Sequence, residues 1–367
     1  MKLAHLNVKS FRNYNEQTLD FHPSLNLIIG HNAQGKTSLL EAIHMLSITK
    51  SHRTLKDQDV IQNHADFAKV EGNLFNEKQK VSMSIVISKN GKKVQYNGMQ
   101  IAKLSDYLGY LTVVMFAPED LDLIKGSPSE RRRFMDLEIA KLKPVYLSYL
   151  NHYRRLLKER NDVLKGLKNQ RFNDTLLDVL TDQLIHYAEK IITFRKEFMQ
   201  SIGEEVKLLY KKLSEENQEI TLMYQPSVYK DFKKSYQQKL KQDTLLGVTH
   251  LGPHRDEVEI IMNKHNIKSY ASQGQIRTVV IALKLAVVNL ITKAKSRPPV
   301  ILLDDVFSEL DSKRQTNLIK TLNIDSQVFI TTNSLHNIAL ENFDDYKILT
   351  IKAGEVKGEE DNAITKL

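Results

Sequence analysis

Two hydrophobic periods divide the chain. Apolar and polar residues alternate along residues 3–8, 25–29 and 81–87, and Lys89-Asn90-Gly91 follows the third run. Alternation with a period of two is typical of strands, and an Asn-Gly pair after a strand is typical of a tight turn. We therefore expect an N-terminal sheet with a hairpin near Asn90 and Gly91.

Beyond this region the period lengthens to that of a helix. Apolar residues recur every three or four positions between Leu180 and Ile202, which places them on one face of a single long helix. Short apolar runs typical of strands return later, at residues 258–262, 300–303 and 328–331. This order predicts an α/β domain interrupted by a helical insertion, with a loose tail from Gly354.

The composition is that of an ordinary folded protein. Hydrophobic residues make up 41% of the 367 residues, which is enough for a sizeable core. The most apolar late segment, Val279 to Ile291, is short and contains Lys284, and the N-terminus lacks a secretory pattern. We expect a cytoplasmic protein with no membrane partner. The absence of cysteine excludes disulfides, thiol catalysis and cysteine-ligated zinc.

Positive charge is concentrated in the middle of the chain. The 53 Lys and Arg exceed the 44 Asp and Glu by nine, and residues 131–241, with 23 Lys and Arg against 15 Asp and Glu, hold eight of those nine charges. Such a balance attracts polyanions such as nucleic acid or anionic lipid. For any one basic cluster, a solvated helix face is the commoner explanation. The candidate DNA phosphate contacts are Arg131 to Arg133, Arg154, Arg155, Lys158, Arg160, Lys230, Lys233 and Lys234. The segment Lys50 to Thr54 could contact either DNA or a second nucleotide, although His52 is as often a surface residue with no role.

A phosphate-binding loop follows one of the expected strands. Residues Gly30 to Thr37 match G-x-x-x-x-G-K-[ST], and a helix-like run follows them. In such a loop the glycines let the backbone wrap a phosphate, Lys36 reaches the β and γ phosphates of ATP, and the Thr37 hydroxyl ligates Mg²⁺. The predicted nucleotide contacts are Gly30, His31, Asn32, Ala33, Gln34, Gly35, Lys36, Thr37 and Ser38.

The other half of the site is expected at the end of a buried strand. Val300-Ile-Leu-Leu runs directly into Asp304 and Asp305. Asp304 is predicted to hold Mg²⁺ together with Thr37, and Asp305 to orient the attacking water, because phosphoryl transfer depends mainly on positioned groups and spread charge. We therefore predict Lys36, Asp304 and Asp305 as catalytic residues.

A long insertion separates the two halves, whereas small-molecule kinases and GTPases have more compact sites. Just before the second half, Ser272-Gln-Gly-Gln275 opens an amphipathic helix. Ser272 is typical of a helix N-cap that could present donors to phosphate. Taken alone, however, these residues are better explained by a simple capped helix.

Four motifs resemble those of ABC ATPases and follow the same order: the phosphate-binding loop, the segment at Ser272, the acidic strand and the segment after it. Ser272-Gln-Gly-Gln is similar to their signature loop, and Ser308-Glu-Leu-Asp311 is similar to their D-loop. The resemblance implies two ATP molecules held between two head-to-tail subunits. It also implies that Ser272 is catalytic and that Ser272 and Gly274 act on the nucleotide of the partner subunit.

A narrower resemblance covers most of the chain. Residues 118–136, 251–257 and 303–311 resemble signature segments of the bacterial RecF family, a branch of the SMC-like ABC ATPases. The first strand also resembles that of SMC-like heads, which implies that Arg12 and Asn13 approach the nucleotide. Membership implies an ATP-dependent homodimer that binds DNA without reading its sequence, a RecR-like partner, and help in loading recombinase at gaps during replication, repair and the SOS response.

Three positions depart from the wider ABC pattern. Asp305 replaces the usual glutamate and is one methylene shorter, which predicts a slow ATPase, expected to be stimulated by DNA. No glutamine typical of a Q-loop precedes Pro118, and Thr331-Thr332-Asn333 contains no switch histidine. The sequence therefore does not identify a sensor of the γ-phosphate.

Three functions compete. In the first, ATP closes a dimer on DNA and hydrolysis reopens it. In the second, the protein is an SMC-like nucleotide-switch scaffold with negligible turnover, which the shorter side chain of Asp305 allows. The third is the motor subunit of an ABC transporter, but the expected Q-loop and coupling surface are absent from the sequence.

The expected fold is α/β, an ABC-type (SMC-like) ATPase head with a P-loop core and an inserted helical second lobe. The boundaries are expected at 1–140 for the part with the P-loop, 141–245 for the helical lobe, and 246–367 for the part with the signature loop, the acidic strand and the D-loop. The insertion is long enough for a compact bundle and too short for an extended coiled-coil rod.

Overall fold

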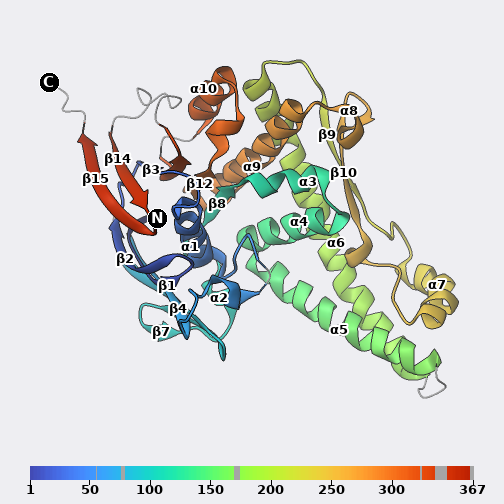
Figure 1. Ribbon diagram of the computed structural model, residues 1–367. Coiled ribbons are helices and arrows are strands. Elements are labelled where there is room, and N and C mark those ends of the chain that lie inside the picture. Colours follow the sequence, from blue (N-terminus) through green and yellow to red (C-terminus); the bar gives the residue numbers. More distant parts are fainter. Residues whose placement is uncertain (55, 76–78, 169–173, 323–324, 335–344, 364–367) are drawn as a thin grey trace. The chain divides into compact units, whose positions relative to one another are not determined.

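The computed structural model describes residues 1–54, 56–75, 79–168, 174–322, 325–334 and 345–363. The chain forms two compact units, coloured by sequence in Figure 1. Unit 1 comprises Met1–Asp120, Leu208–Glu216 and Arg277–Leu367, and unit 2 comprises Leu121–Lys207 and Asn217–Ile276.

The expected boundaries were at residues 140 and 245. The helical unit instead begins at Leu121 and ends at Ile276. Helix α4 (Pro128–Leu142) packs against α5 (Pro144–Lys168) and strand β10 (Glu257–Met262), all within unit 2. Residues 121–140 and 246–276 therefore belong with the helical region. Ser272 lies in unit 2 as a result, whereas most of the helix that follows it lies in unit 1.

The first sheet of unit 1 is antiparallel, with strand order β2-β1-β4-β5-β6-β7. Its β5–β6 connection is the predicted hairpin, in which Ser88 pairs with Gly91. The strands are β1 (Lys2–Phe11), β2 (Tyr14–Asp20), β4 (Phe67–Phe75), β5 (Lys80–Ser88), β6 (Gly91–Tyr96) and β7 (Met99–Gln100).

The second sheet of unit 1 has the order β15-β14-β3-β13-β12-β8, parallel from β14 to β8. Parallel strands bring their carboxyl ends to one edge, which is where ligands bind in α/β sheets. The loop after β3 therefore lies beside the residues that follow β12 and β13. The strands are β3 (Leu25–Ile29), β8 (Val113–Phe116), β12 (Val300–Asp304), β13 (Val328–Thr332), β14 (Asp345–Lys352) and β15 (Glu355–Ala363).

Helix α1 (Lys36–Ile48) lies between the two sheets of unit 1 (Figure 1). Its buried side chains, including Leu39 and Ile43, share one hydrophobic core with Leu6 of the first sheet and Leu302 of the second. Burial of each such side chain contributes about 1.5–3 kcal/mol, so the start of α1 and hence the phosphate loop are held firmly. The other helices of this unit are α2 (Leu104–Tyr107), α10 (Ser312–Thr321) and, from Arg277, α9 (Gln273–Lys295).

Among the residues that the structure describes, α9 alone is long and apolar enough by composition to cross a membrane. Within its most apolar window, 72% is buried inside the fold. Lys284, which interrupts the apolar run, is buried and pairs with Asp120 at 2.6 Å. Such burial is what a core helix shows.

Unit 2 combines a helical bundle with a small sheet. The predicted long helix is α6 (Asp174–Ser214), which has 41 residues, of which the last seven belong to unit 1. Its apolar face is buried at Leu184, Ile191 and Ile202, and α5 runs antiparallel beside it (Figure 1). The remaining elements are α3 (Asp122–Lys125), α7 (Phe232–Leu246), α8 (Ile267–Tyr270), and the sheet β11-β10-β9 with β9 (Ile220–Gln225) and β11 (His265–Asn266).

The expectation of a loose tail from Gly354 is wrong for residues 355–363. These residues form β15 and pair with β14 along its length. The turn between the two strands contacts the phosphate loop, because Gly354 N–H donates to Gln34 O at 2.9 Å and Ala353 N–H donates to Gln34 Oε1 at 2.6 Å. The hairpin thus supports the loop from outside. Residues 364–367 lie outside the described part of the chain.

Candidate nucleotide-binding site

The phosphate loop lies between β3 and α1, as its motif predicts. Two of its residues have left-handed backbone conformations, Ala33 with φ 64° and Gly35 with φ 119°. A Cβ on Gly35 would lie 2.7 Å from Asn13 Nδ2, so only glycine allows the loop to approach the turn between β1 and β2. Successive N–H groups and the start of α1 then face the cavity, where they favour anions.

Lys36 ends the loop with its ammonium held by three acceptors. Lys36 Nζ donates to Gly30 O at 2.5 Å, to His31 O at 3.0 Å and to Asn333 Oδ1 at 2.7 Å. Burial lowers the pKa of Lys36, and the charges of Asp305 and Asp304 oppose that shift. The ammonium is thus positioned, and phosphate oxygens could replace these neutral acceptors with negative charge.

Asp304 ends β12 beside α1 and is almost fully buried. Its Oδ1 accepts from Thr37 Oγ1 at 3.0 Å and from Thr331 Oγ1 at 2.7 Å. Burial raises the pKa of Asp304, whereas the hydroxyls of Thr331 and Thr37 oppose the rise and the charge of Glu119 adds to it. The structure therefore brings the two predicted metal ligands, Thr37 and Asp304, into direct contact.

Thr331 was not predicted as a site residue, although its hydroxyl hydrogen-bonds to both Asp304 and Asp305. Besides donating to Asp304, its Oγ1 accepts from Asp305 N–H at 2.9 Å. Asp305 has a left-handed backbone with φ 51°, which is uncommon for a residue with a side chain. The parallel register of β12 and β13, which places Asp304 opposite Thr331, is the reason for this arrangement, and single-strand patterns carry no such information.

The oxygen-rich group around Asp304 suits Mg²⁺ only when a nucleotide is present. Within the described residues, no group of three or more His, Cys, Asp or Glu is arranged to hold a metal ion. Mg²⁺ usually binds through one or two protein oxygens together with phosphates and water. The hydroxyl of Thr37 and the carboxylate of Asp304 fit that requirement.

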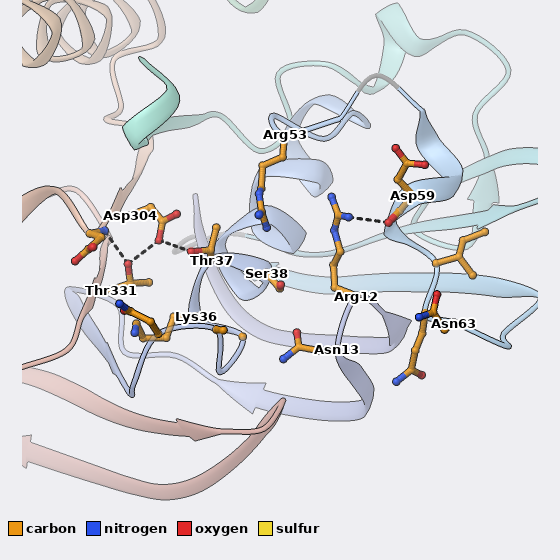
Figure 2. Close-up of a pocket in the computed structure, with 16 residues that line it drawn as sticks. Arg12, Asn13, Lys36, Thr37, Ser38, Arg53, Asp59, Asn63, Asp304 and Thr331 are labelled. Atoms are coloured by element: carbon orange, nitrogen blue, oxygen red, sulfur yellow. Dashed lines mark hydrogen bonds between the residues drawn. The ribbon is translucent and has the colours of Figure 1, made fainter. Parts of the chain in front are cut away.

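A cavity of about 800 Å³ opens beside these residues, entirely within unit 1 (Figure 2). Arg12 lines it and is fixed by the buried Glu41, with Nη2 to Oε1 at 2.6 Å and Nε to Oε2 at 2.9 Å. The predicted residues that line the cavity are Arg12, Asn13, Asn32, Ala33, Gly35, Lys36, Thr37, Ser38, Asp304 and Asp305. Gly30, His31 and Gln34 do not line it, and Gln34 instead holds the β14–β15 turn.

Arg53 is a further cation that lines the cavity. The sequence alone did not decide whether its segment contacts DNA, contacts a second nucleotide or only lies on the surface. Figure 2 shows its side chain extending toward Thr37 and Ser38. Its neighbour His52 packs edge to face on His44, and burial lowers the pKa of His52 to about 4. His52 is therefore a neutral packing residue, whereas Arg53 adds positive charge next to the phosphate loop.

The signature-like segment forms the predicted cap of α9. Gln275 N–H donates to Ser272 Oγ at 3.3 Å, and Ser272 N–H donates to Gln275 Oε1 at 3.0 Å, a reciprocal capping arrangement. Within unit 1, Arg277 of the same helix pairs with Glu309 at 3.0 Å, in the segment that resembles a D-loop. Ser272 and Gly274 themselves belong to unit 2, and their action on a partner's nucleotide stays a prediction.

The fold and the cavity define the class of protein. A P-loop nucleotide site has a glycine-rich loop between a strand and a helix, with a lysine at the end of the loop. It also has a buried aspartate that accepts a hydrogen bond from the threonine after that lysine. The chain is thus a P-loop nucleotide-binding protein.

Comparison with known proteins narrows this class. The family model "RecF/RecN/SMC N terminal domain" matches residues 2–356. The DNA replication and repair protein RecF of Halalkalibacterium halodurans is 40% identical over 97% of this chain and 99% of its own length. That of Staphylococcus carnosus is also 40% identical, over 97% of this chain and its full length.

Solved structures agree with this match. A structure of the recombination mediator protein RecF with ATP, in the RecFOR pathway, is 30% identical and has a TM-score of 0.89 over 99% of this chain and 98% of that one. An SMC head bound to the C-winged helix domain of ScpA is 18% identical with a TM-score of 0.58, over 100% of this chain and 99% of that one, which supports the fold alone. The chain belongs to the RecF family of SMC-like ATPases.

Proposed function

We propose that this protein binds and hydrolyses ATP in order to close as a homodimer on DNA during replication and recombinational gap repair. The observation that carries the proposal is the contact between Thr37 and Asp304 beside the positioned ammonium of Lys36. Relatives named for DNA replication and repair, and a RecF–ATP structure described within the RecFOR pathway, support the biological setting. We place the protein in the cytoplasm.

Each residue of the cavity has a task in this proposal. Lys36 and the N–H groups of the loop bind the β and γ phosphates. Thr37 and Asp304 would hold Mg²⁺, which would spread the negative charge of the phosphates. Asp305 orients the attacking water. Thr331 holds the carboxylate of Asp304 and the backbone of Asp305 in place through two hydrogen bonds of its hydroxyl.

A second copy of the chain supplies the residues that contact the opposite side of the nucleotide. Ser272 and Gly274 of the partner contact the γ-phosphate, so two ATP molecules join two subunits. DNA that favours the closed dimer must, by linkage, also strengthen ATP binding, and hydrolysis then releases DNA. A RecR-like partner and recombinase loading complete the role. The short side chain of Asp305 makes turnover slow.

Release of DNA distinguishes this ATPase from a nucleotide-switch scaffold. With ATP, the wild-type protein should retain a labelled DNA duplex, with affinity falling by about 10³ or more between 50 and 200 mM salt if six or more phosphates are contacted. Asp305→Asn should prolong retention after an ATP chase, because hydrolysis opens the dimer. Asp66→Asn, an exposed acid outside the cavity, serves as the control.

Two results would contradict the proposal. Unchanged DNA release and nucleotide exchange in Asp305→Asn would favour the scaffold. A flat salt dependence of the wild-type protein would reject binding through the DNA backbone.

A further inference from the structure

A buried arginine organises three separate segments of unit 2. Arg195 of α6 is 1% exposed, and its guanidinium contacts Asp136 of α4 at 2.8 Å and Asp256 at 3.0 Å. It also donates to Pro253 O at 2.7 Å. Burying charges is costly unless their geometry is well satisfied, so these groups form a stiff support.

The turn at residues 252–256 is locked against this support. Gly252 has φ 119°, and a Cβ there would lie 2.3 Å from Tyr153 Oη and 2.7 Å from Tyr236 Oη. Tyr236 Oη donates to Leu251 O at 2.8 Å, and the hydroxyl of Tyr153 lies 2.7 Å from His254 Nδ1. Burial lowers the pKa of His254 to about 4, so the ring is neutral and adds no charge.

Two further arginines contact these two aspartates nearer the solvent, and a third precedes Asp256 in the sequence. Arg255 directly precedes Asp256 and is exposed, and its backbone N–H donates to Gly252 O at 2.8 Å. Its side chain makes no hydrogen bond or ion pair among the described residues. Arg154 is 60% exposed and reaches Asp136 only at 3.4 Å. Arg132 is half-buried and donates to Asp256 O at 2.7 Å. We call Arg132, Arg154 and Arg255 the arginine cluster.

The charges of this group do not balance. In the described part of the chain, only Arg195 and Arg154 form ion pairs with the carboxylates of these two aspartates. Arg132 donates to a main-chain carbonyl and Arg255 has no side-chain partner among the described residues, so no described ion pair compensates their two positive charges. Burial and the charge of Arg195 both lower the pKa of Arg132, so an added anion would stabilise its charged form.

Other basic residues of the sequence candidates have partners of their own. Arg131 makes a bidentate contact with Glu257, at 2.9 and 3.1 Å. Arg160 is 1% exposed and pairs with Asp243 at 2.9 Å. Arg160 is thus buried and Arg131 is held by its carboxylate partner. The exposed Arg255, which sequence reasoning had not named as a DNA contact, has no side-chain partner among the described residues.

We propose that the arginine cluster is a contact surface for the phosphate backbone of duplex DNA. The inference rests on the proposed DNA-binding function and locates it on unit 2. Guanidinium groups bind phosphate through two parallel hydrogen bonds, and rigid presentation lowers the entropy lost on binding. Phosphate contacts position a protein without reading sequence.

The test is a salt titration of duplex binding in the presence of ATP, followed by fluorescence anisotropy. Arg255→Ala should lower the slope of log affinity against log salt by about one per contacted phosphate, and the triple variant with Arg132→Ala and Arg154→Ala by about three. Arg255→Lys should keep most of the slope, because it keeps the charge.

Matched controls separate contact from folding. Lys165→Ala removes an exposed lysine of the same helix as Arg154, one that pairs with Asp162 at 3.4 Å, and should leave the slope unchanged. The melting temperature of Arg255→Ala should equal that of the wild type, because the side chain of Arg255 makes no described contact and alanine keeps its backbone hydrogen bond to Gly252.

The outcomes are distinguishable. Wild-type DNA binding combined with an unchanged slope in both Arg255→Ala and the triple variant would overturn the inference and leave the proposed function standing, with the cluster then open to an acidic protein partner. Failure of the wild type to bind duplex DNA with ATP would overturn the proposed function and the inference together.

Discussion

Lys36→Ala is expected to weaken ATP binding by about 10- to 100-fold and to abolish hydrolysis, because a hydrogen bond to a charged group contributes about 1.5–3 kcal/mol. The three acceptors that hold the ammonium keep it in place before ATP arrives, so its loss removes a preorganised partner of the β and γ phosphates. Thermal unfolding measures the effect, since ATP at 100 times its Kd should stabilise the wild type by about 2.7 kcal/mol.

The variant should need proportionally more ATP for the same rise in melting temperature. Lys93→Ala, which removes an exposed lysine of β6 outside the cavity, is the matched control and should behave like the wild type. An unaltered ATP titration of Lys36→Ala would show that the cavity does not bind the triphosphate as described.

Arg195→Met is expected to lower the free energy of unfolding of unit 2 by about 3–5 kcal/mol, because it leaves two buried carboxylates without their shared cation. Burial opposes the charge on Arg195, but Asp136 and Asp256 outweigh it and hold the pKa of the guanidinium above its ordinary value. The measurement is urea unfolding followed by circular dichroism. Domains are commonly stable by about 5–15 kcal/mol, so a loss of this size should be evident.

Arg155→Met provides the comparison, since its ion pair is exposed and should contribute less than about 1 kcal/mol. If the midpoint of Arg195→Met matched that of Arg155→Met, the support beneath the arginine cluster would not have the strength assigned to it.

The local pattern was enough to find two elements that build the cavity and one long helix outside it. The phosphate loop, the apolar strand before Asp304 and the long helix of unit 2 each depend on short-range spacing, and each lies where its pattern predicted. The hairpin after Ser88 was found for the same reason.

Features that depend on pairing between distant segments were missed. The hydrogen bond from Ala353 N–H to the side chain of Gln34 was not predicted, because it depends on the β14–β15 hairpin packing on the outside of the loop. The nucleotide contact of Gln34 stays a prediction. Thr331 and Asn333 reach the site only through the parallel register of β13 with its neighbours. A single strand pattern does not reveal which strand will lie beside it.

Sheet membership was missed for a similar reason. The run at residues 258–262 was predicted correctly as a strand, but as part of the α/β domain. It forms β10 in the small sheet of unit 2, paired with β9 and β11. Its alternating burial fits either sheet, so the partner strands decide where it belongs.

In the proposed dimer, Ser272 of one subunit completes the ATP-binding site of the other. Mixing two inactive variants tests this shared site most directly. Lys36→Ala lacks the phosphate contact and Ser272→Arg blocks the facing loop, so each alone should be inactive. In an equimolar mixture, half of the dimers carry one intact composite site, and hydrolysis should recover to about a quarter of the wild-type rate. No recovery, with mixed dimers demonstrated by sedimentation, would contradict the shared site.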